Sequence, residues 1–183
     1  MNLLKSLSII ALMFTFALAS ISFADSPDSG EMDKMEPYQG SAEFERIKSL
    51  EGTWTGTADM HGKEMPVTIN YETSSGGSVV IETMMPGTPH EMVSIYYEED
   101  GKLMMKHYCL LYNQPVMALK NSGDNSIELE FVEGKNMDES KEMHMHSVTF
   151  TFNGDNEMTQ SWTSYKDGKP EGESSDFTFT RRS

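Results

Sequence analysis

Four side chains of types that ligate metal ions are the candidates for a shared site: His107, Cys109, His144 and His146. Alternate residues of a β-strand lie on one face, about 6.5–7 Å apart, so His144 and His146 can turn towards a single ion. Lys106 is expected to face solvent, which turns its neighbours His107 and Cys109 inward. A third imidazole or a thiolate from another strand would complete a zinc or copper site.

Methionine is several times more frequent than usual, since 14 of the 16 methionines follow residue 24. Three groupings stand out: Met84-Met85, Met104-Met105 and Met143-x-Met145. Thioethers bind copper(I). However, these methionines fall on expected strands rather than in a loop, and Met143 and Met145 lie opposite His144 and His146 in the alternation. The pattern favours methionine as flexible filler around an adaptable apolar pocket.

Catalytic motifs are absent from the sequence. It contains no Gly-x-Ser-x-Gly, no phosphate-binding loop, no His-Glu-x-x-His and no paired cysteines. His107 and Cys109 are two residues apart, so they lie in parallel and lack the third group that would orient a catalytic base. No catalytic residue is predicted. An enzyme acting on a small apolar substrate remains an alternative that the fold class permits.

The N-terminus has the features of a secretory signal. Lys5 supplies a positive charge, residues 7–18 are apolar, and Ser22-Phe23-Ala24 places small residues where a signal peptidase reads. Cleavage is predicted before Asp25, giving an exported protein, periplasmic or secreted. A membrane anchor is the alternative, but the apolar stretch is shorter than the roughly twenty residues that a span requires.

The 159 residues that follow are the size of one domain and carry a net charge of −16, because Lys5 leaves with the signal. Such a surface repels nucleic acid and anionic membranes, so neither is expected as a partner. The single cysteine excludes an intrachain disulfide. Residues 25–40 are acidic and rich in Pro, Gly and Ser, and predict a disordered leader before a domain at 41–183.

Within that domain, Ser41 is expected to cap a short helix that ends at Leu50. From Gly52 onward, apolar residues alternate with period two between Gly-, Asn- and Asp-containing turns. The pattern predicts strands at 52–59, 65–74, 78–84, 91–98, 102–112, 115–120, 126–131, 143–152, 157–166 and 174–181. Short connections favour an all-β, about ten-stranded antiparallel up-and-down barrel over a Greek key.

The segment Gly52-Thr53-Trp54-Thr55-Gly56 resembles the opening of a calycin barrel. In lipocalins and fatty-acid-binding proteins this Trp closes one end, and a basic residue of the last strand packs across it. The resemblance assigns these parts to Trp54 and Arg181. The same opening is similar to haem-binding nitrobindin-type barrels, but these place their iron-ligating His near the C-terminus, and no His follows His146 here.

The runs Met105-Lys106-His107-Tyr108-Cys109 and Asn113-Gln114-Pro115 resemble exported bacterial lipocalin-like domains of unknown function, over most of residues 44–181. That family has Gly before the Asn-Gln-Pro and a basic residue after it. This chain has Tyr112 and Val116 instead, so an anion contact by the basic residue does not carry over.

The leading functional hypothesis is therefore a binder of a small, largely apolar molecule in a barrel cavity. The predicted ligand-binding residues are Trp54, Tyr71, Met105, His107, Phe150, Gln160 and Trp162, and Ile69, Ile81 and Leu129 are expected to line the cavity with them. The alternative is a copper, zinc or haem carrier that uses His107, Cys109, His144 and His146. The competing interpretation of the three histidines is that they bind no metal and are buried polar residues or residues at the barrel rim. A solid barrel that acts through a surface partner is a third possibility, and no oligomeric state is indicated.

Overall fold

The computed structural model describes residues 36–59 and 64–183. The predicted signal peptide and residues 25–35 of the predicted leader lie outside the described residues. Within the described part of the chain, no helix is long and apolar enough to cross a membrane.

The domain consists of one short helix and eleven strands. They are α2 (Ala42–Lys48), β1 (Gly52–Asp59), β2 (Glu64–Ser74), β3 (Val79–Met84), β4 (Met92–Glu99), β5 (Lys102–Tyr108), β6 (Gln114–Gly123), β7 (Ser126–Lys135), β8 (His144–Phe152), β9 (Glu157–Lys166), β10 (Lys169–Pro170) and β11 (Ser175–Arg181), with a 3₁₀ turn at Ser75–Gly77.

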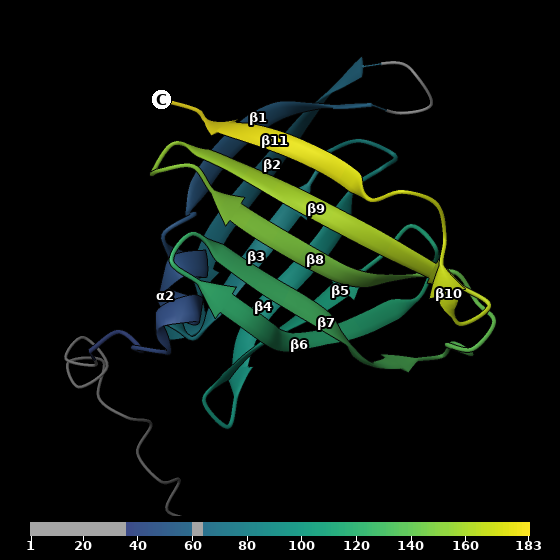
Figure 1. Cartoon of the computed structure of the whole chain (residues 1–183). Coiled ribbons are helices and arrows are strands. Elements are labelled where there is room, and N and C mark those ends of the chain that lie inside the picture. Colours follow the sequence, from purple (N-terminus) through teal and green to yellow (C-terminus); the bar gives the residue numbers. More distant parts are fainter. Residues whose placement is uncertain (1–35, 60–63) are drawn as a thin grey trace, which may run out of the picture. The chain divides into compact units, whose positions relative to one another are not determined.

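The strands form a closed antiparallel barrel (Figure 1). From β1 to β9, each strand pairs with the next in chain order, and β11 lies between β9 and β1 to complete the ring. The two-residue β10 pairs with the end of β9. Ten strands therefore close the barrel, and the predicted up-and-down architecture is confirmed.

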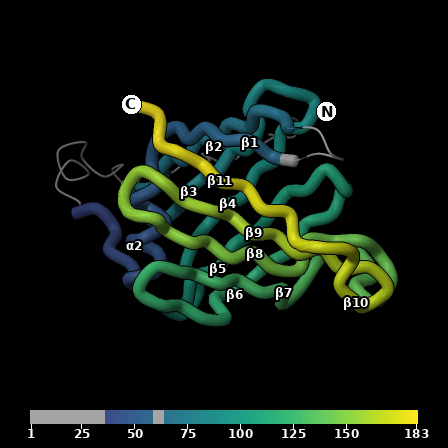
Figure 2. The backbone as a smooth tube through the Cα atoms, turned by 45° about the horizontal axis from the view of Figure 1, so that its top comes forward, coloured from purple at the N-terminus to yellow at the C-terminus, as the bar shows by residue number. Residues whose placement is uncertain are grey.

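Helix α2 lies across one end of the barrel (Figures 1 and 2). As predicted, the Ser41 side chain caps it by accepting a hydrogen bond from the Phe44 backbone N–H at 3.2 Å. Phe44, Ile47 and Leu50 are buried against the barrel core. A seven-residue helix has little stability alone, so this apolar stripe is what holds it in place. We call this end of the barrel the closed end.

The last residues of the predicted leader also contact the domain. Tyr38 donates a backbone hydrogen bond to Gly76 O at 2.8 Å, and its hydroxyl donates to Glu98 at 2.7 Å. The Gly40 backbone N–H donates to the Glu45 side chain at 2.9 Å. The chain is thus attached to the barrel a few residues before the helix begins.

The opposite end, the open end, carries the turns at 85–91, 109–113, 136–143 and 167–174. Strand β5 ends at Tyr108, not at residue 112 as predicted, because Cys109 and Asn113 close a turn through a backbone hydrogen bond at 3.3 Å. Tyr112 in this turn has a φ of 62° and is 96% exposed. Leu110, Leu111 and Tyr112, which the sequence predicts as the end of this strand, are therefore exposed.

Strand β3 has the opposite phase to the one predicted. Val80, Glu82 and Met84 are buried, whereas Ile81 is only partly buried. Because neighbours in a strand point to opposite faces, Ile81 faces away from the barrel interior and does not line it. The correction matters because it places Glu82 inside the barrel.

Candidate functional site

Glu82 is the hub of a hydrogen-bond network inside the barrel and is 1% exposed. Its Oε2 atom accepts hydrogen bonds from Tyr71 Oη at 2.7 Å, Tyr96 Oη at 2.8 Å and Gln160 Nε2 at 3.0 Å. Its Oε1 atom accepts one from Ser94 Oγ at 3.2 Å. Register explains the convergence, because Glu82 is the paired residue of Tyr71 on β2 and of Ser94 on β4.

Burial dominates the electrostatics of this network. Removal from water raises the pKa of Glu82 above its ordinary value, although the four donated hydrogen bonds act in the opposite direction. Burial, followed by the nearby Glu82 carboxyl, raises the pKa of Tyr71 and of Tyr96 well above the usual range, so both phenols stay protonated donors.

The network continues to His107 and Trp162. Ser94 Oγ lies 3.0 Å from His107 Nδ1, and Trp162 Nε1 donates to Gln160 Oε1 at 2.9 Å. The His107 and Trp162 rings pack with centroids 5.0 Å apart. Burial lowers the pKa of His107 to about 4, so the imidazole is neutral at physiological pH. His107 Nε2 is buried without a hydrogen-bond partner.

Next to this network, towards the open end, is a small cavity with an entirely apolar lining. We call it the open-end cavity; its lining residues are Met84, Met92, His107, Met145, Trp162 and Phe177. Its volume is about 30 Å³, room for roughly one or two water-sized atoms. Met92, Met145 and Phe177 are only partly buried, so its wall is thin on the side of the open end.

The seven residues predicted to bind a ligand separate into three groups. His107 and Trp162 line the open-end cavity. Tyr71 and Gln160 belong to the Glu82 network, and the remaining three, Trp54, Met105 and Phe150, are buried in the packed core. The predicted cavity through the middle of the barrel is therefore occupied by side chains, and Ile69 and Leu129 are also part of that core.

Trp54 and Arg181 meet at the closed end. The Arg181 guanidinium lies over the Trp54 ring at 4.3 Å, and the Trp54 indole donates to Leu50 O at 2.7 Å. Arg181 also donates to Glu51 O at 2.5 Å and to Ser49 O at 2.7 Å, so it joins the end of β11 to the turn before β1. Gly52, the first residue of β1, has a φ of 119°, which favours a residue without a Cβ.

The predicted metal ligands do not converge. His144 Nε2 lies 3.2 Å from His146 Nδ1, and the two rings pack with Phe131 and Tyr165, the His146 and Tyr165 rings being stacked with centroids 3.6 Å apart. These four aromatic side chains line a separate pocket of about 240 Å³ beside Glu139 and Ser140. His107 is not among them.

A β-bulge changes which side chains of β8 pack on the core. The register with β9 shifts between Met145 and Ser147. Met145 packs against the hydrophobic core together with Val148, Phe150 and Phe152, whereas His144 and His146 contact Phe131 and Tyr165. Strict period-two alternation would put Met145 and Val148 on opposite faces, because it allows for no extra residue in the strand.

Cys109 lies just beyond the end of β5 and is partly buried. Burial raises the pKa of its thiol, which disfavours the thiolate that binds metals. Among residues 36–59 and 64–183, no three His, Cys, Asp or Glu side chains gather in a way that would hold a metal ion. The four predicted ligands thus lie in three places.

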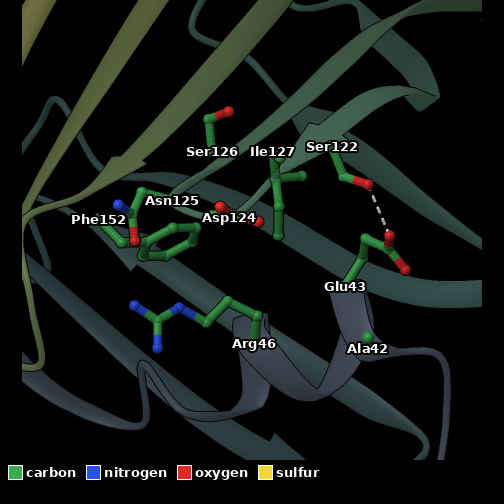
Figure 3. A pocket seen from close by; sticks show the side chains of 10 residues that line it. Ala42, Glu43, Arg46, Ser122, Asp124, Asn125, Ser126, Ile127 and Phe152 are labelled. Carbon is green, nitrogen blue, oxygen red and sulfur yellow. Dashed lines mark hydrogen bonds between the residues drawn. The ribbon is translucent and has the colours of Figure 1, made fainter.

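A surface pocket of about 300 Å³ lies between α2 and the β6–β7 turn (Figure 3). Its polar groups are engaged with one another: Ser122 Oγ donates to Glu43 at 2.7 Å, and the Arg46 guanidinium lies over the Phe152 ring at 4.4 Å. None of the predicted ligand residues lines it. These contacts attach the helix to the barrel.

The sequence does not predict Glu82, Ser94, Tyr96, Met84, Met92, Met145 or Phe177 as site residues. In β3 both phases carry apolar residues, Val79 and Ile81 on one face and Val80 and Met84 on the other, so alternation does not choose between them. An acidic residue within an apolar strand is the one signal that points to a buried polar network.

Comparisons with known proteins show the fold. No protein-family model and no curated protein matches the chain. Rv2717c from M. tuberculosis has a similar structure, with 14% identity, 79% of this chain and 100% of that chain covered, and a TM-score of 0.50. A redesigned β-barrel also matches, with 12% identity, 75% and 95% coverage, and a TM-score of 0.36. The first likeness agrees with the closed β-barrel.

Proposed function

We propose that this protein is an exported, calycin-like binding protein that takes a small ligand at the open end of its barrel. The observation that carries the proposal is the open-end cavity, an apolar space next to a polar network that holds His107 and Trp162 in place. Apolar walls with a few fixed polar groups are typical of ligand sites.

The size of the cavity limits the ligand. Sites for drug-sized molecules occupy about 300–1,000 Å³, some ten times more than the 30 Å³ found here. Methionine has three rotatable bonds and adapts its shape readily. An apolar molecule therefore enters by displacing Met92 and Met145, the two partly exposed thioethers of the wall, and rests against Trp162.

Two features favour binding over catalysis. Glu82 is held by four hydrogen bonds and does not line the open-end cavity, so it is not positioned to exchange a proton with a bound molecule. Burial raises the pKa of the Cys109 thiol, which makes it a weak nucleophile.

Ligand binding is tested with protein purified from an exporting host. Native mass spectrometry is expected to show a retained small molecule, and a neutral naphthylamine dye is expected to bind with a change in Trp162 fluorescence. Met145→Phe fills the cavity and should abolish dye binding, whereas Met65→Phe, at a half-exposed methionine outside the cavity, should not. An apo mass together with no dye binding would contradict the proposal.

Export rests on residues 1–24 and is tested separately. N-terminal sequencing of the protein recovered outside the cytoplasm is expected to begin at Asp25. A mature chain that still carries the apolar segment 7–18 would show that the segment serves as an anchor.

A further inference from the structure

The open-end cavity brings together side chains that can donate electron pairs to a soft metal ion. Three of its six lining residues are methionines, Met84, Met92 and Met145, and a fourth is His107. Met84 and Met92 are register partners on β3 and β4, while Met145 comes from β8. Three thioethers and an imidazole around a space of about 30 Å³ form a soft donor set of neutral charge.

The hydrogen bonds of His107 leave one nitrogen free for a ligand. When the Glu82 carboxyl is ionised, Ser94 Oγ donates its proton to Glu82 and accepts one from His107 Nδ1 at 3.0 Å. In that state Nδ1 carries the imidazole proton, and Nε2 keeps a lone pair. Nε2 is buried without a hydrogen-bond partner in a side chain that is 3% exposed. Metal-binding histidines commonly have such a fixed second nitrogen.

The neutral charge and the soft character of these donors determine which metal ions the cavity can bind. No carboxylate lines the cavity, so hard ions such as Mg²⁺ or Ca²⁺ find no carboxylate oxygen ligands there. Neutral donors leave the two charges of Zn²⁺ uncompensated in a buried site. A monovalent soft ion meets thioethers, a neutral imidazole and Trp162, an aromatic ring of the kind that attracts cations.

We propose that the open-end cavity is a binding site for a soft monovalent metal ion, copper(I) or its analogue silver(I), ligated by His107 Nε2 and the thioethers of Met84, Met92 and Met145. This inference goes beyond the proposed function, because it assigns a second class of ligand to the same cavity. Glu82 and Ser94 are positioning residues that hold the tautomer of His107.

The test is a silver(I) titration of the full mature chain carrying Cys109→Ser, which removes the competing thiol. Silver(I) is used because it does not change oxidation state, and copper(I) under anaerobic reduction with a chromogenic competitor provides the second probe. We expect one equivalent to bind, with quenching of Trp162 fluorescence. The methyl NMR signals of three methionines, those of Met84, Met92 and Met145, should shift.

Leucine variants isolate the ligands because they keep the apolar volume and remove only the sulfur. Loss of an outer hydrogen-bond partner costs about 10–100-fold in metal affinity, and loss of a ligand should cost at least as much. We therefore expect Met92→Leu and Met145→Leu to bind silver(I) at least about tenfold more weakly. Met158→Leu, at a buried core methionine outside the cavity, is the matched control and should bind as before.

The outcomes separate this inference from the proposed function. No stoichiometric binding, or binding unchanged in the Met92→Leu, Met145→Leu double variant, overturns the metal site. If the naphthylamine dye still binds in that case, the open end remains a ligand site and only the metal assignment fails. If both silver(I) and the dye fail to bind, the proposed function fails too. Zinc binding at the same methionines would also overturn the assignment.

Discussion

The buried carboxyl of Glu82 is the residue on which the interior depends most. Five polar side chains, those of Tyr71, Glu82, Ser94, Tyr96 and Gln160, satisfy one another in a region otherwise filled by apolar atoms. Inside a protein such networks are costly when a member is removed, because the remaining groups keep no partner and no water.

Replacing Glu82 should therefore destabilise the domain. Glu82→Ala leaves two phenols and an amide without their acceptor, and we expect a loss of about 3 kcal/mol in the free energy of unfolding, measured by urea denaturation. Glu82→Gln keeps the shape and an acceptor oxygen and should lose less. A similar loss in both variants would show that volume, not hydrogen bonding, is what Glu82 contributes.

The raised pKa of Glu82 gives this residue a defined pH signature. The folded protein retains the Glu82 proton at pH values where the unfolded chain, with the ordinary value of 4.5, has released it. Its contribution to the free energy of unfolding thus falls as pH rises from about 4.5 to the raised pKa, and is constant on either side. The stability difference between wild type and Glu82→Gln should show this slope. A difference that grows with pH would contradict it.

His107 should make the free energy of unfolding depend on pH in the opposite direction to Glu82. Its folded pKa of about 4 lies below the ordinary 6.5, so the unfolded chain takes up a proton first as pH falls. The His107 contribution is fully present above pH 6.5 and is lost between 6.5 and about 4, by roughly 3 kcal/mol for a shift of this size. The free energy of unfolding of wild type and of His107→Gln, measured by urea denaturation across this pH range, isolates the His107 contribution as the difference between the two. His90, which is exposed, is the control position.

At the scale of the elements, closure of the barrel depends on how β11 is attached to β1. Arg181 combines a cation–π contact with Trp54 and hydrogen bonds to Ser49 O and Glu51 O. Its backbone register pairs it directly with Trp54. One side chain thus links the last strand, the first strand and the turn that follows α2.

Arg181→Ala should therefore lower stability by about 1–3 kcal/mol, the sum of an exposed cation–π contact and hydrogen bonds from a charged donor. Thermal unfolding followed by Trp54 fluorescence measures it. The neighbouring exposed Arg182 makes its recorded contact with Thr53 through the backbone, so Arg182→Ala should be neutral. Equal effects of the two variants would mean that only charge matters.

At the scale of the whole molecule, the dominant property is acidity. The 183 residues of the chain carry a net charge of −15. Such a charge opposes compaction through self-repulsion, which salt screens over about 10 Å at 0.1 M. Raising the salt concentration should therefore raise the melting temperature, with each 1 kcal/mol gained equivalent to roughly 2–4 °C for a domain of this size. A melting temperature that falls with salt would show that ion pairs outweigh the repulsion.

The sequence by itself determined the class of the fold. Alternation along the strands and turn residues between them predict an all-β up-and-down barrel, because one buried face requires period two and short turns require neighbouring strands to pair. The Ser41 cap was also readable, since capping depends on residues three apart. These are local properties of the chain.

Only the tertiary structure decided which side chains meet inside. The bulge in β8 lets Met145 pack on the core while His144 and His146 contact Phe131 and Tyr165, and neither its position nor its effect is encoded in the alternation. Strand β3 is apolar in both phases, so its pairing with β2 and β4 was needed to place Glu82 beside Tyr71. Which residues of a strand face inward, and which side chains meet there, depend on contacts between strands distant in sequence. The open-end cavity results from both.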